Sequence, residues 1–177
     1  MPGLKIRLAG LEDTQRLGRC LAGAVAERNP GVIFLYGDLG AGKSALAGAL
    51  ARSLPGGGLA EPSSPSFTLC NIYCTVPPVH HFDLYRLPGG SYFEALEESL
   101  ADAAVLTLVE WPENLAKDAR PEDGVSLRLS RPAGFPDRAG PDLSDEERVA
   151  EIFAMGPAGG RFLRRLAARR LFSFNRE

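Results

Sequence analysis

The feature that most constrains this chain is the segment from Gly37 to Ser44, which reads Gly-Asp-Leu-Gly-Ala-Gly-Lys-Ser. It matches the phosphate-loop pattern G-x-x-x-x-G-K-[ST], which requires a strand before it and a helix after it. Residues 31–36 form an apolar run rich in β-forming side chains, and residues 44–54 repeat leucine every fourth position. The sequence therefore predicts a buried strand, a phosphate loop and a helix, in that order.

Each residue type in this loop has a task in holding a polyphosphate. Glycines let the backbone approach an anion, and main-chain N–H groups together with the start of the following helix can cradle it. Lys43 is predicted to bridge the β- and γ-phosphates, and the Ser44 hydroxyl to bind Mg²⁺. The predicted nucleotide-binding residues of the loop are Gly37, Asp38, Leu39, Gly40, Ala41, Gly42, Lys43 and Ser44. The alternative is a glycine-rich turn with an exposed lysine.

Length and charge narrow the function classes. A chain of 177 residues predicts one domain over residues 1–177. The net charge of −2 excludes a polyanion binder that works by bulk charge, so any nucleic-acid contact needs a local basic patch. The start lacks the regions of a signal peptide, and no apolar run approaches membrane-spanning length. We therefore expect a cytoplasmic protein without a membrane contact.

The remaining elements follow from hydrophobic spacing and from capping and turn residues. Asp13 or Thr14 is predicted to cap a helix that carries Leu17, Leu21 and Val25 on one face. Further strands are expected at about 4–8, after residue 69 to about 75, at 79–86, 105–109, 125–129 and 148–154, the last strand. A helix capped by Ser91 is expected over 91–100. Residues 131–147, rich in Pro, Gly and charge, indicate an exposed insertion or a mobile loop.

The C-terminal part, residues 157–177, is predicted to form a basic amphipathic helix over 160–171 and a tail. Arginines alternate with apolar residues along it. Two interpretations stay open: a helix that docks a protein or tRNA, and a solvated face.

Two acidic residues at strand ends are candidates for the metal and hydrolysis chemistry. Glu110 follows the wholly apolar run 105–109, and Asp83 follows residues 79–82. Acids at the carboxyl ends of strands lie at the edge where ligands bind in open α/β folds. The sequence favours a functional role for Glu110 and leaves Asp83 open between a functional acid and a solvated strand end. His80 and His81 are adjacent on a strand, so their side chains point to opposite faces and cannot share a metal.

Hydroxyl groups at Ser64, Ser66 and Thr68 precede the second half of the chain. Such a loop could reach a γ-phosphate or the attacking water, as switch segments do. Serine and proline also form ordinary turns, so the residues alone leave this open.

Four sequence blocks together resemble the TsaE (YjeE) family. They are the phosphate loop, Ser64-Pro65-Ser66-Phe67-Thr68-Leu69, His81-Phe82-Asp83-Leu84-Tyr85-Arg86-Leu87 and Val109-Glu110-Trp111-Pro112. Their order and spacing match over roughly residues 10 to 130. The phosphate loop is shared with many NTPases, whereas the block that begins at His81 and the Glu110-Trp111 pair are much more specific.

The resemblance implies a P-loop NTPase-like α/β fold of three layers, with a central mixed sheet flanked by helices. It implies an ATPase of tRNA threonylcarbamoyladenosine synthesis that uses ATP and Mg²⁺, associates with TsaB and TsaD, and meets tRNA only indirectly. Carried over by position, Ser44 and Glu110 bind the metal, Asp83, Glu110 and Lys43 are catalytic, and Trp111 lies beside the site. The resemblance also assigns nucleotide contacts to Thr14, Thr68 and Arg148.

The chain departs from the family pattern at three places. Ser44 stands where threonine is usual, which conserves the metal-binding hydroxyl, and Ser66 stands where threonine is common. The segment 131–147 is longer than the pattern, which weakens the alignment of Arg148.

Three other functions compete with this interpretation. A small-molecule or nucleotide kinase would need an arginine-bearing lid, for which Arg131 and Arg138 are the candidates. A GTPase would need the Asn-Lys-x-Asp motif, which the sequence lacks. A non-catalytic nucleotide sensor would use the same loop only as an interaction module.

Overall fold

The computed structural model describes residues 3–59, 65, 68–90, 93–132, 147–169 and 175–176. These residues form a mixed sheet of eight strands in the order β3-β4-β5-β2-β6-β7-β1-β8. The strands are β1 (Leu4–Leu8), β2 (Val32–Tyr36), β3 (Cys70–Tyr73), β4 (Val79–Asp83), β5 (Leu106–Glu110), β6 (Gly124–Ser130), β7 (Arg148–Met155) and β8 (Asn175–Arg176). The helices are α1 (Leu11–Glu27), α2 (Lys43–Ser53), α3 (Glu94–Ala101) and α4 (Gly156–Ala168).

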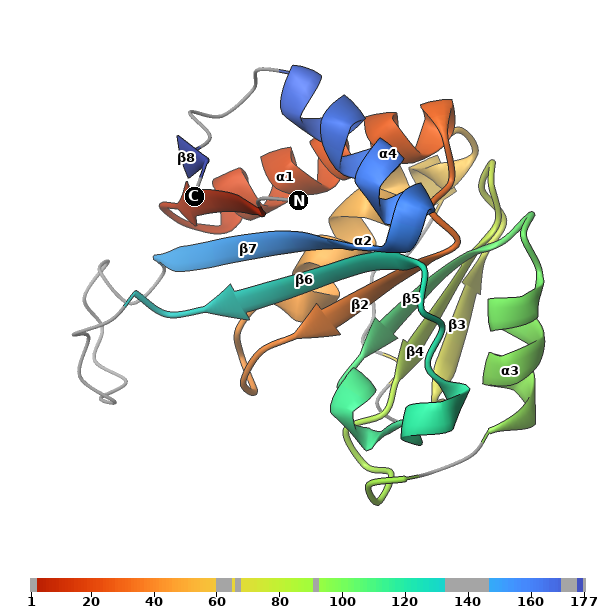
Figure 1. The fold of residues 1–177 in the computed structure, drawn as a ribbon. Helices are drawn as coiled ribbons and strands as arrows, with labels where there is room; N and C mark the ends of the chain where they lie inside the picture. The colour runs from red at the N-terminus through yellow and green to blue at the C-terminus, as the bar shows by residue number, and fades with distance from the viewer. Residues whose placement is uncertain are drawn as a thin grey trace.

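The helices cover the two faces of the sheet unequally. α1, α2 and α4 lie on one face and α3 lies on the other (Figure 1). The larger core packs the apolar faces of α1, α2 and α4 against the sheet, and the smaller core packs α3 around Phe34 and Phe82. The expected three-layer α/β fold is confirmed.

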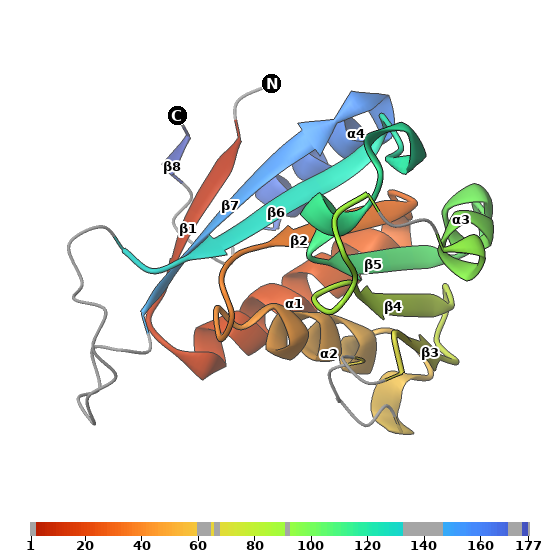
Figure 2. The ribbon, with the colours of Figure 1, turned by 90° about the horizontal axis from the view of Figure 1, so that it is seen from below.

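Strand direction decides where a ligand can bind. β4, β5, β2 and β6 pair in parallel, so their carboxyl ends share one edge of the sheet. β3 runs antiparallel to β4, and β7 and β1 extend the other side of the sheet in antiparallel fashion (Figure 2). The crevice outside the carboxyl ends of parallel strands is where open α/β sheets bind ligands.

The start of α1 differs from the sequence prediction. The helix begins at Leu11 after Gly10, so Asp13 and Thr14 lie inside its first turns and the predicted cap is wrong. The Asp13 carboxylate accepts the Ala9 N–H at 2.9 Å, which binds the incoming chain to the helix start. The predicted apolar face is confirmed, because Leu17, Leu21 and Val25 are buried.

Two other helix starts also differ. α3 begins at Glu94 with Phe93 at its N-cap, so the predicted helix start at residue 91 is wrong, and Ser91 itself lies outside the described residues. α4 begins at Gly156, four residues before the predicted start. There the Asp123 carboxylate accepts the N–H groups of Ala158 and Gly159 at 2.8 and 3.1 Å. This cap comes from a residue more than thirty positions away in the sequence, so local patterns could not reveal it.

The end of the described chain adds one strand to the predicted order. β7 matches the predicted strand over 148–154, but β8 follows it and pairs with β1. Residues 133–146 of the predicted insertion lie outside the described residues. Among the helices that the structure describes, none combines the length and the apolar character needed to cross a membrane.

Candidate functional site

The phosphate loop joins the carboxyl end of β2 to the first residue of α2. Gly40 and Gly42 have φ angles of +77° and +99°, which side-chain-bearing residues rarely adopt. Apart from the neighbouring residues in the chain, no atom of the described residues lies within 4 Å of where a Cβ would stand at either glycine, so the loop borders open space. The Gly42 carbonyl accepts the Leu46 N–H at 2.9 Å and starts the helix. The N–H groups of the first helical turn have no partner within the helix and are available to an anion.

Lys43 is buried beneath the loop, with 4% of its surface exposed. Its Nζ donates hydrogen bonds to the carbonyl oxygens of Gly37 at 2.6 Å and Asp38 at 2.9 Å. The same atom lies 3.9 Å from the centre of the Trp111 ring, a cation–π contact. Burial lowers the pKa of Lys43, and the carboxylates of Glu110 and Asp83 oppose that shift. The ammonium group is thus held at the loop by carbonyl, aromatic and carboxylate groups.

The two candidate acids stand side by side at the ligand edge of the sheet. Asp83 ends β4 and Glu110 ends β5, and the two residues are direct partners in the parallel register. Both are buried, with 3% and 2% of their surface exposed. Alternation along β5 puts Glu110 on the same face as Leu108, in the core that α2 covers. Both carboxylates therefore face the helix that carries Lys43.

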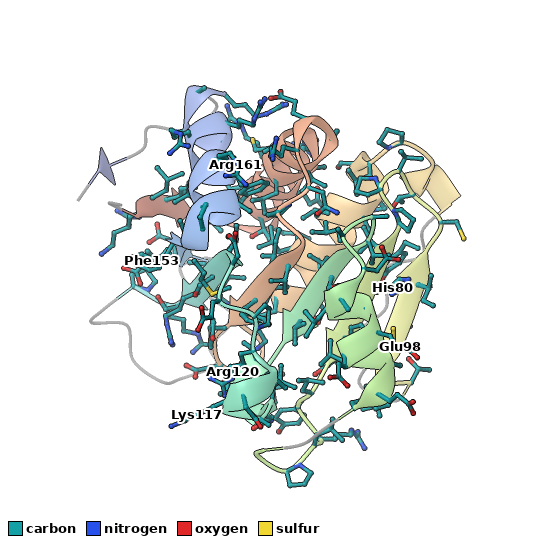
Figure 3. The ribbon with its side chains drawn as sticks, turned by 45° about the vertical axis from the view of Figure 1, so that its right-hand side comes forward. His80, Glu98, Lys117, Arg120, Phe153 and Arg161 are labelled. Carbon is teal, nitrogen blue, oxygen red and sulfur yellow. The ribbon has the colours of Figure 1, made fainter. Side chains whose placement is uncertain are left out.

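Glu110 has a buried partner that the sequence analysis did not assign. The Nε2 atom of His81 lies 2.8 Å from the Glu110 carboxylate, and His81 is fully buried. An ionised carboxylate can only accept, so Nε2 is the donor when Glu110 is charged. His80 lies on the opposite face beside α3, where its Nδ1 is 3.0 Å from the Ser99 hydroxyl (Figure 3). The predicted divergence of the two histidines is confirmed.

Trp111 and Tyr85 form the aromatic side of the site. Trp111 has a φ angle of +56°, and its N–H donates to the Leu35 carbonyl at 3.3 Å. A bulky residue in this conformation is strained, and such strain clusters at functional sites. The Tyr85 ring lies 5.0 Å from the Trp111 ring, centre to centre. In the sequence, Tyr85 is visible only as part of a family block, with no signal for its role.

These groups surround a pocket of about 210 Å³, which we call the phosphate-loop pocket. The described residues that line it are Leu39, Gly40, Ala41, Gly42, Lys43, Ser44, Ala45, Asp83, Tyr85, Glu110 and Trp111. The structure thus brings loop residues 39–44 and both acids, which the sequence predicted as separate candidates, into one cavity. The predicted loop residues Gly37 and Asp38 are not among the described residues that line it; their carbonyls accept hydrogen bonds from Lys43.

The pocket offers oxygen ligands for Mg²⁺, and phosphate oxygens of a bound nucleotide would complete the set. It offers the Ser44 hydroxyl and the carboxylates of Asp83 and Glu110, the oxygen ligands that Mg²⁺ prefers. Within the described part of the chain, no three His, Cys, Asp or Glu residues gather as a metal site. Mg²⁺ commonly binds one or two carboxylates together with substrate phosphates, and these residues fit that mode.

The other predicted nucleotide contacts lie in different positions. Thr14 is buried in α1, where its hydroxyl donates to the Gly10 carbonyl at 3.3 Å. The Thr68 hydroxyl lies 3.2 Å from Asn71 Oδ1 on an exposed part of the chain. Arg148 reaches the loop, with Nη2 at 3.4 Å from the Gly40 carbonyl. None of the three is among the described residues that line the pocket, and Ser64 and Ser66 lie outside the described residues.

Sequence comparisons with known proteins identify a family and several of its members. The sequence profile of the family described as "Threonylcarbamoyl adenosine biosynthesis protein TsaE" matches residues 8–138. The tRNA threonylcarbamoyladenosine biosynthesis protein TsaE of Streptomyces coelicolor is 32% identical, over 80% of this chain and 90% of that protein. The protein of the same name from Bacillus subtilis is 34% identical, over 88% and 89% of the two chains.

A solved structure extends the similarity to three dimensions. The crystal structure of Bacillus subtilis YdiB superposes with a TM-score of 0.70 at 29% sequence identity. The match covers 94% of this chain and 95% of that one. The fold, the profile and the sequence relatives therefore agree: this chain belongs to the TsaE family.

Proposed function

We propose that the chain binds ATP with Mg²⁺ in the phosphate-loop pocket and hydrolyses it in the service of tRNA threonylcarbamoyladenosine synthesis. The observation that carries the proposal is the convergence of Lys43, Asp83 and Glu110 on one cavity beneath the loop. A lone phosphate loop would support nucleotide binding alone. Two buried carboxylates in register beside it add the groups that phosphoryl transfer to water needs.

Phosphate binding falls to the loop and to Lys43. Main-chain N–H groups from Gly40 to Ser44 and the positive end of α2 offer donors to phosphate oxygens. In the structure, Lys43 Nζ donates hydrogen bonds to two loop carbonyls, those of Gly37 and Asp38. A bound polyphosphate would compete for that ammonium group, and its greater negative charge favours the exchange. Arg148, next to the Gly40 carbonyl, stands ready to add a second positive charge at the loop.

The hydrolytic step falls to the two acids. We assign Ser44 and Glu110 to Mg²⁺, which when bound neutralises charge on the phosphates. His81 fixes the orientation of the Glu110 carboxylate through its hydrogen bond. We assign Asp83 to the attacking water, which it would orient and from which it would accept a proton. The Tyr85 N–H donates to Asp83 Oδ1 at 3.0 Å and holds that side chain in place.

The partners follow from the family. Its members are named for threonylcarbamoyladenosine synthesis on tRNA, and the sequence resemblance implies association with TsaB and TsaD. We propose that this chain supplies ATP hydrolysis to that pair and does not itself transfer the threonylcarbamoyl group.

Thr14 and Thr68 keep their proposed nucleotide contacts, which require Thr68 to approach the pocket when ATP binds.

One experiment separates this function from its rivals. ATP hydrolysis by the full chain is measured alone, with TsaB and TsaD, and with candidate small-molecule or nucleotide acceptors. We expect slow hydrolysis that rises when both proteins are present, and co-purification of the three proteins that depends on ATP. Phosphate transfer to an acceptor without partners would identify a kinase instead. ATP binding without hydrolysis under any of these conditions would identify a nucleotide sensor.

A further inference from the structure

The arginines of the C-terminal helix border a hollow that the proposed ATPase function does not use. This hollow, of about 590 Å³, lies between the end of α1 and α4. We call it the arginine hollow, and the described residues that line it are Glu27, Arg28, Arg161, Arg164, Arg165, Ala168 and Arg169. Figure 3 labels Arg161 where α4 runs beside α1. The end of α1 leads into the start of β2, so the hollow and the phosphate loop lie at opposite ends of that strand.

The charge of the hollow is opposite to that of the chain. Five arginines and Glu27 give its described lining a charge of +4. The whole chain has a net charge of −2, so all other residues together carry −6. Concentrating like charges in one place costs free energy through their repulsion, which an anionic partner relieves. This is the local basic patch that nucleic-acid binding by an acidic chain requires.

Parts of the hollow are held in place before any partner arrives. Glu27 accepts hydrogen bonds from Arg165 at 2.7 Å and Arg169 at 2.6 Å. The Arg169 guanidinium packs against Gly23 of α1, where a Cβ would collide with it. The Nε atoms of Arg161 and Arg169 are buried without a hydrogen-bond partner among the described residues. The hydrogen bonds to Glu27 and the packing against Gly23 therefore fix part of the lining before any ligand binds.

The residue types in the lining indicate which anion fits. All of the basic residues are arginines, whose planar guanidinium groups bind phosphate through paired N–H donors. Arg161, Arg165 and Arg169 recur every four residues, which spaces them about 6 Å apart along one side of α4. A regular row of cations suits a polymer with regularly spaced phosphates better than the irregular carboxylates of a folded protein. The described lining has no aromatic ring for bases to stack on.

We propose that the arginine hollow binds the phosphodiester backbone of RNA, without reading its sequence. This goes beyond the proposed function, in which tRNA is met only through the partner proteins. The proposal is also independent of ATP chemistry, since the hollow and the phosphate-loop pocket share no residue.

The test is RNA binding by the full chain as a function of salt. Fluorescence anisotropy of a labelled tRNA transcript is measured for the natural chain and for the double variant Arg164→Gln/Arg165→Gln. Both arginines are exposed, so the substitutions leave the core intact. We expect affinity to fall at least about tenfold, and the slope of log affinity against log salt to fall by about 2, one unit per phosphate contact. Affinity for ATP should not change.

A matched control removes two positive charges elsewhere. Arg7→Gln/Lys117→Gln changes the net charge equally at exposed sites, and Figure 3 shows Lys117 at the opposite end of the molecule from Arg161. We expect this control to bind RNA within about twofold of the natural chain, because it removes no contact in the hollow. Equal weakening by both double variants would overturn the proposal. Tighter binding of poly-glutamate than of RNA at the same salt would also overturn it, in favour of an acidic protein partner.

Discussion

The phosphate-loop pocket and the arginine hollow organise charge in opposite ways. In the pocket, Lys43, Asp83 and Glu110 are all at least 96% buried, and each has named neighbours that fix its position. In the hollow, Glu27 and Arg165 each expose nearly half of their side chains, 46% and 45%. A buried charge that loses its partner stays out of water, whereas an exposed charge is solvated again. Single substitutions should therefore have large effects in the pocket and small ones in the hollow.

The largest effect is expected for Lys43→Ala. The change removes the charge that faces the phosphates and the cation beside two buried carboxylates. We expect ATP affinity to fall at least about a hundredfold, or ~2.7 kcal/mol. Trp111 is the single tryptophan of the chain and lies 3.9 Å from Lys43 Nζ, so its fluorescence can report binding beside calorimetry. Circular dichroism checks that the variant folds, and unchanged affinity in a folded variant would contradict the phosphate-loop assignment.

The next largest effect is expected for Asp83→Ala and for Glu110→Ala. Each removes one of the two carboxylates proposed for the hydrolytic step, while the phosphate loop keeps its contacts. We expect hydrolysis in the presence of the partner proteins to fall about 10²- to 10⁴-fold, with ATP still bound. Full activity in both variants would make the acids structural. It would also contradict the comparison between the pocket and the hollow, because the buried charges of the pocket would then have no functional consequence.

A third prediction concerns His81, which bonds Glu110 from the core side. His81→Leu removes the donor, and we expect kcat to fall about 10- to 100-fold with little change in KM for ATP. His81→Gln can place an amide donor near the Nε2 position and should restore part of kcat. A residue that acts only through packing would show no such rescue.

His80 supplies the control for that prediction. It has the same chemistry one residue away, but it faces α3 and contacts Ser99. His80→Leu should leave kcat unchanged, whatever it does to thermal stability. A loss of kcat equal to that of His81→Leu would show that the strand, and not the Glu110 contact, matters.

Much of the pocket could be predicted because its residues occur in recognisable local sequence patterns. The phosphate loop has a fixed spacing, and Asp83 and Glu110 follow apolar runs, so their strand-end positions were visible. The fold followed, because the same apolar runs define the buried strands. What the sequence could not show is the register that pairs Asp83 with Glu110, since pairing between strands is set by contacts across the sheet.

The same limit explains what was missed. His81 meets Glu110 across 29 positions, and Asp123 caps α4 across 35. Neither contact leaves a local pattern. The arginines of α4 are recognisable in the sequence as a basic helix face. The sequence leaves two interpretations open because the hollow also requires the end of α1. There Glu27, 138 positions before Arg165, accepts a hydrogen bond from that arginine. The sequence therefore reveals residue types and local patterns, but not these contacts between distant segments.

The smallest effect is expected for Glu27→Gln in the hollow. Hydrogen bonds from Arg165, and then Arg169, lower the pKa of Glu27 below its ordinary value of 4.5. A carboxyl whose pKa is lower in the folded state stabilises the fold above its ordinary pKa, and this contribution disappears as pH falls through the lowered value. At neutral pH we therefore expect a melting temperature less than about 3 °C below that of the natural chain. The difference should shrink as the pH is lowered below 4.5. Added salt should shrink it at neutral pH too, because exposed ion pairs are screened. A large difference in melting temperature that does not change with salt or pH would mean that Glu27 behaves like the buried acids of the pocket. The contrast between the two regions would then be wrong.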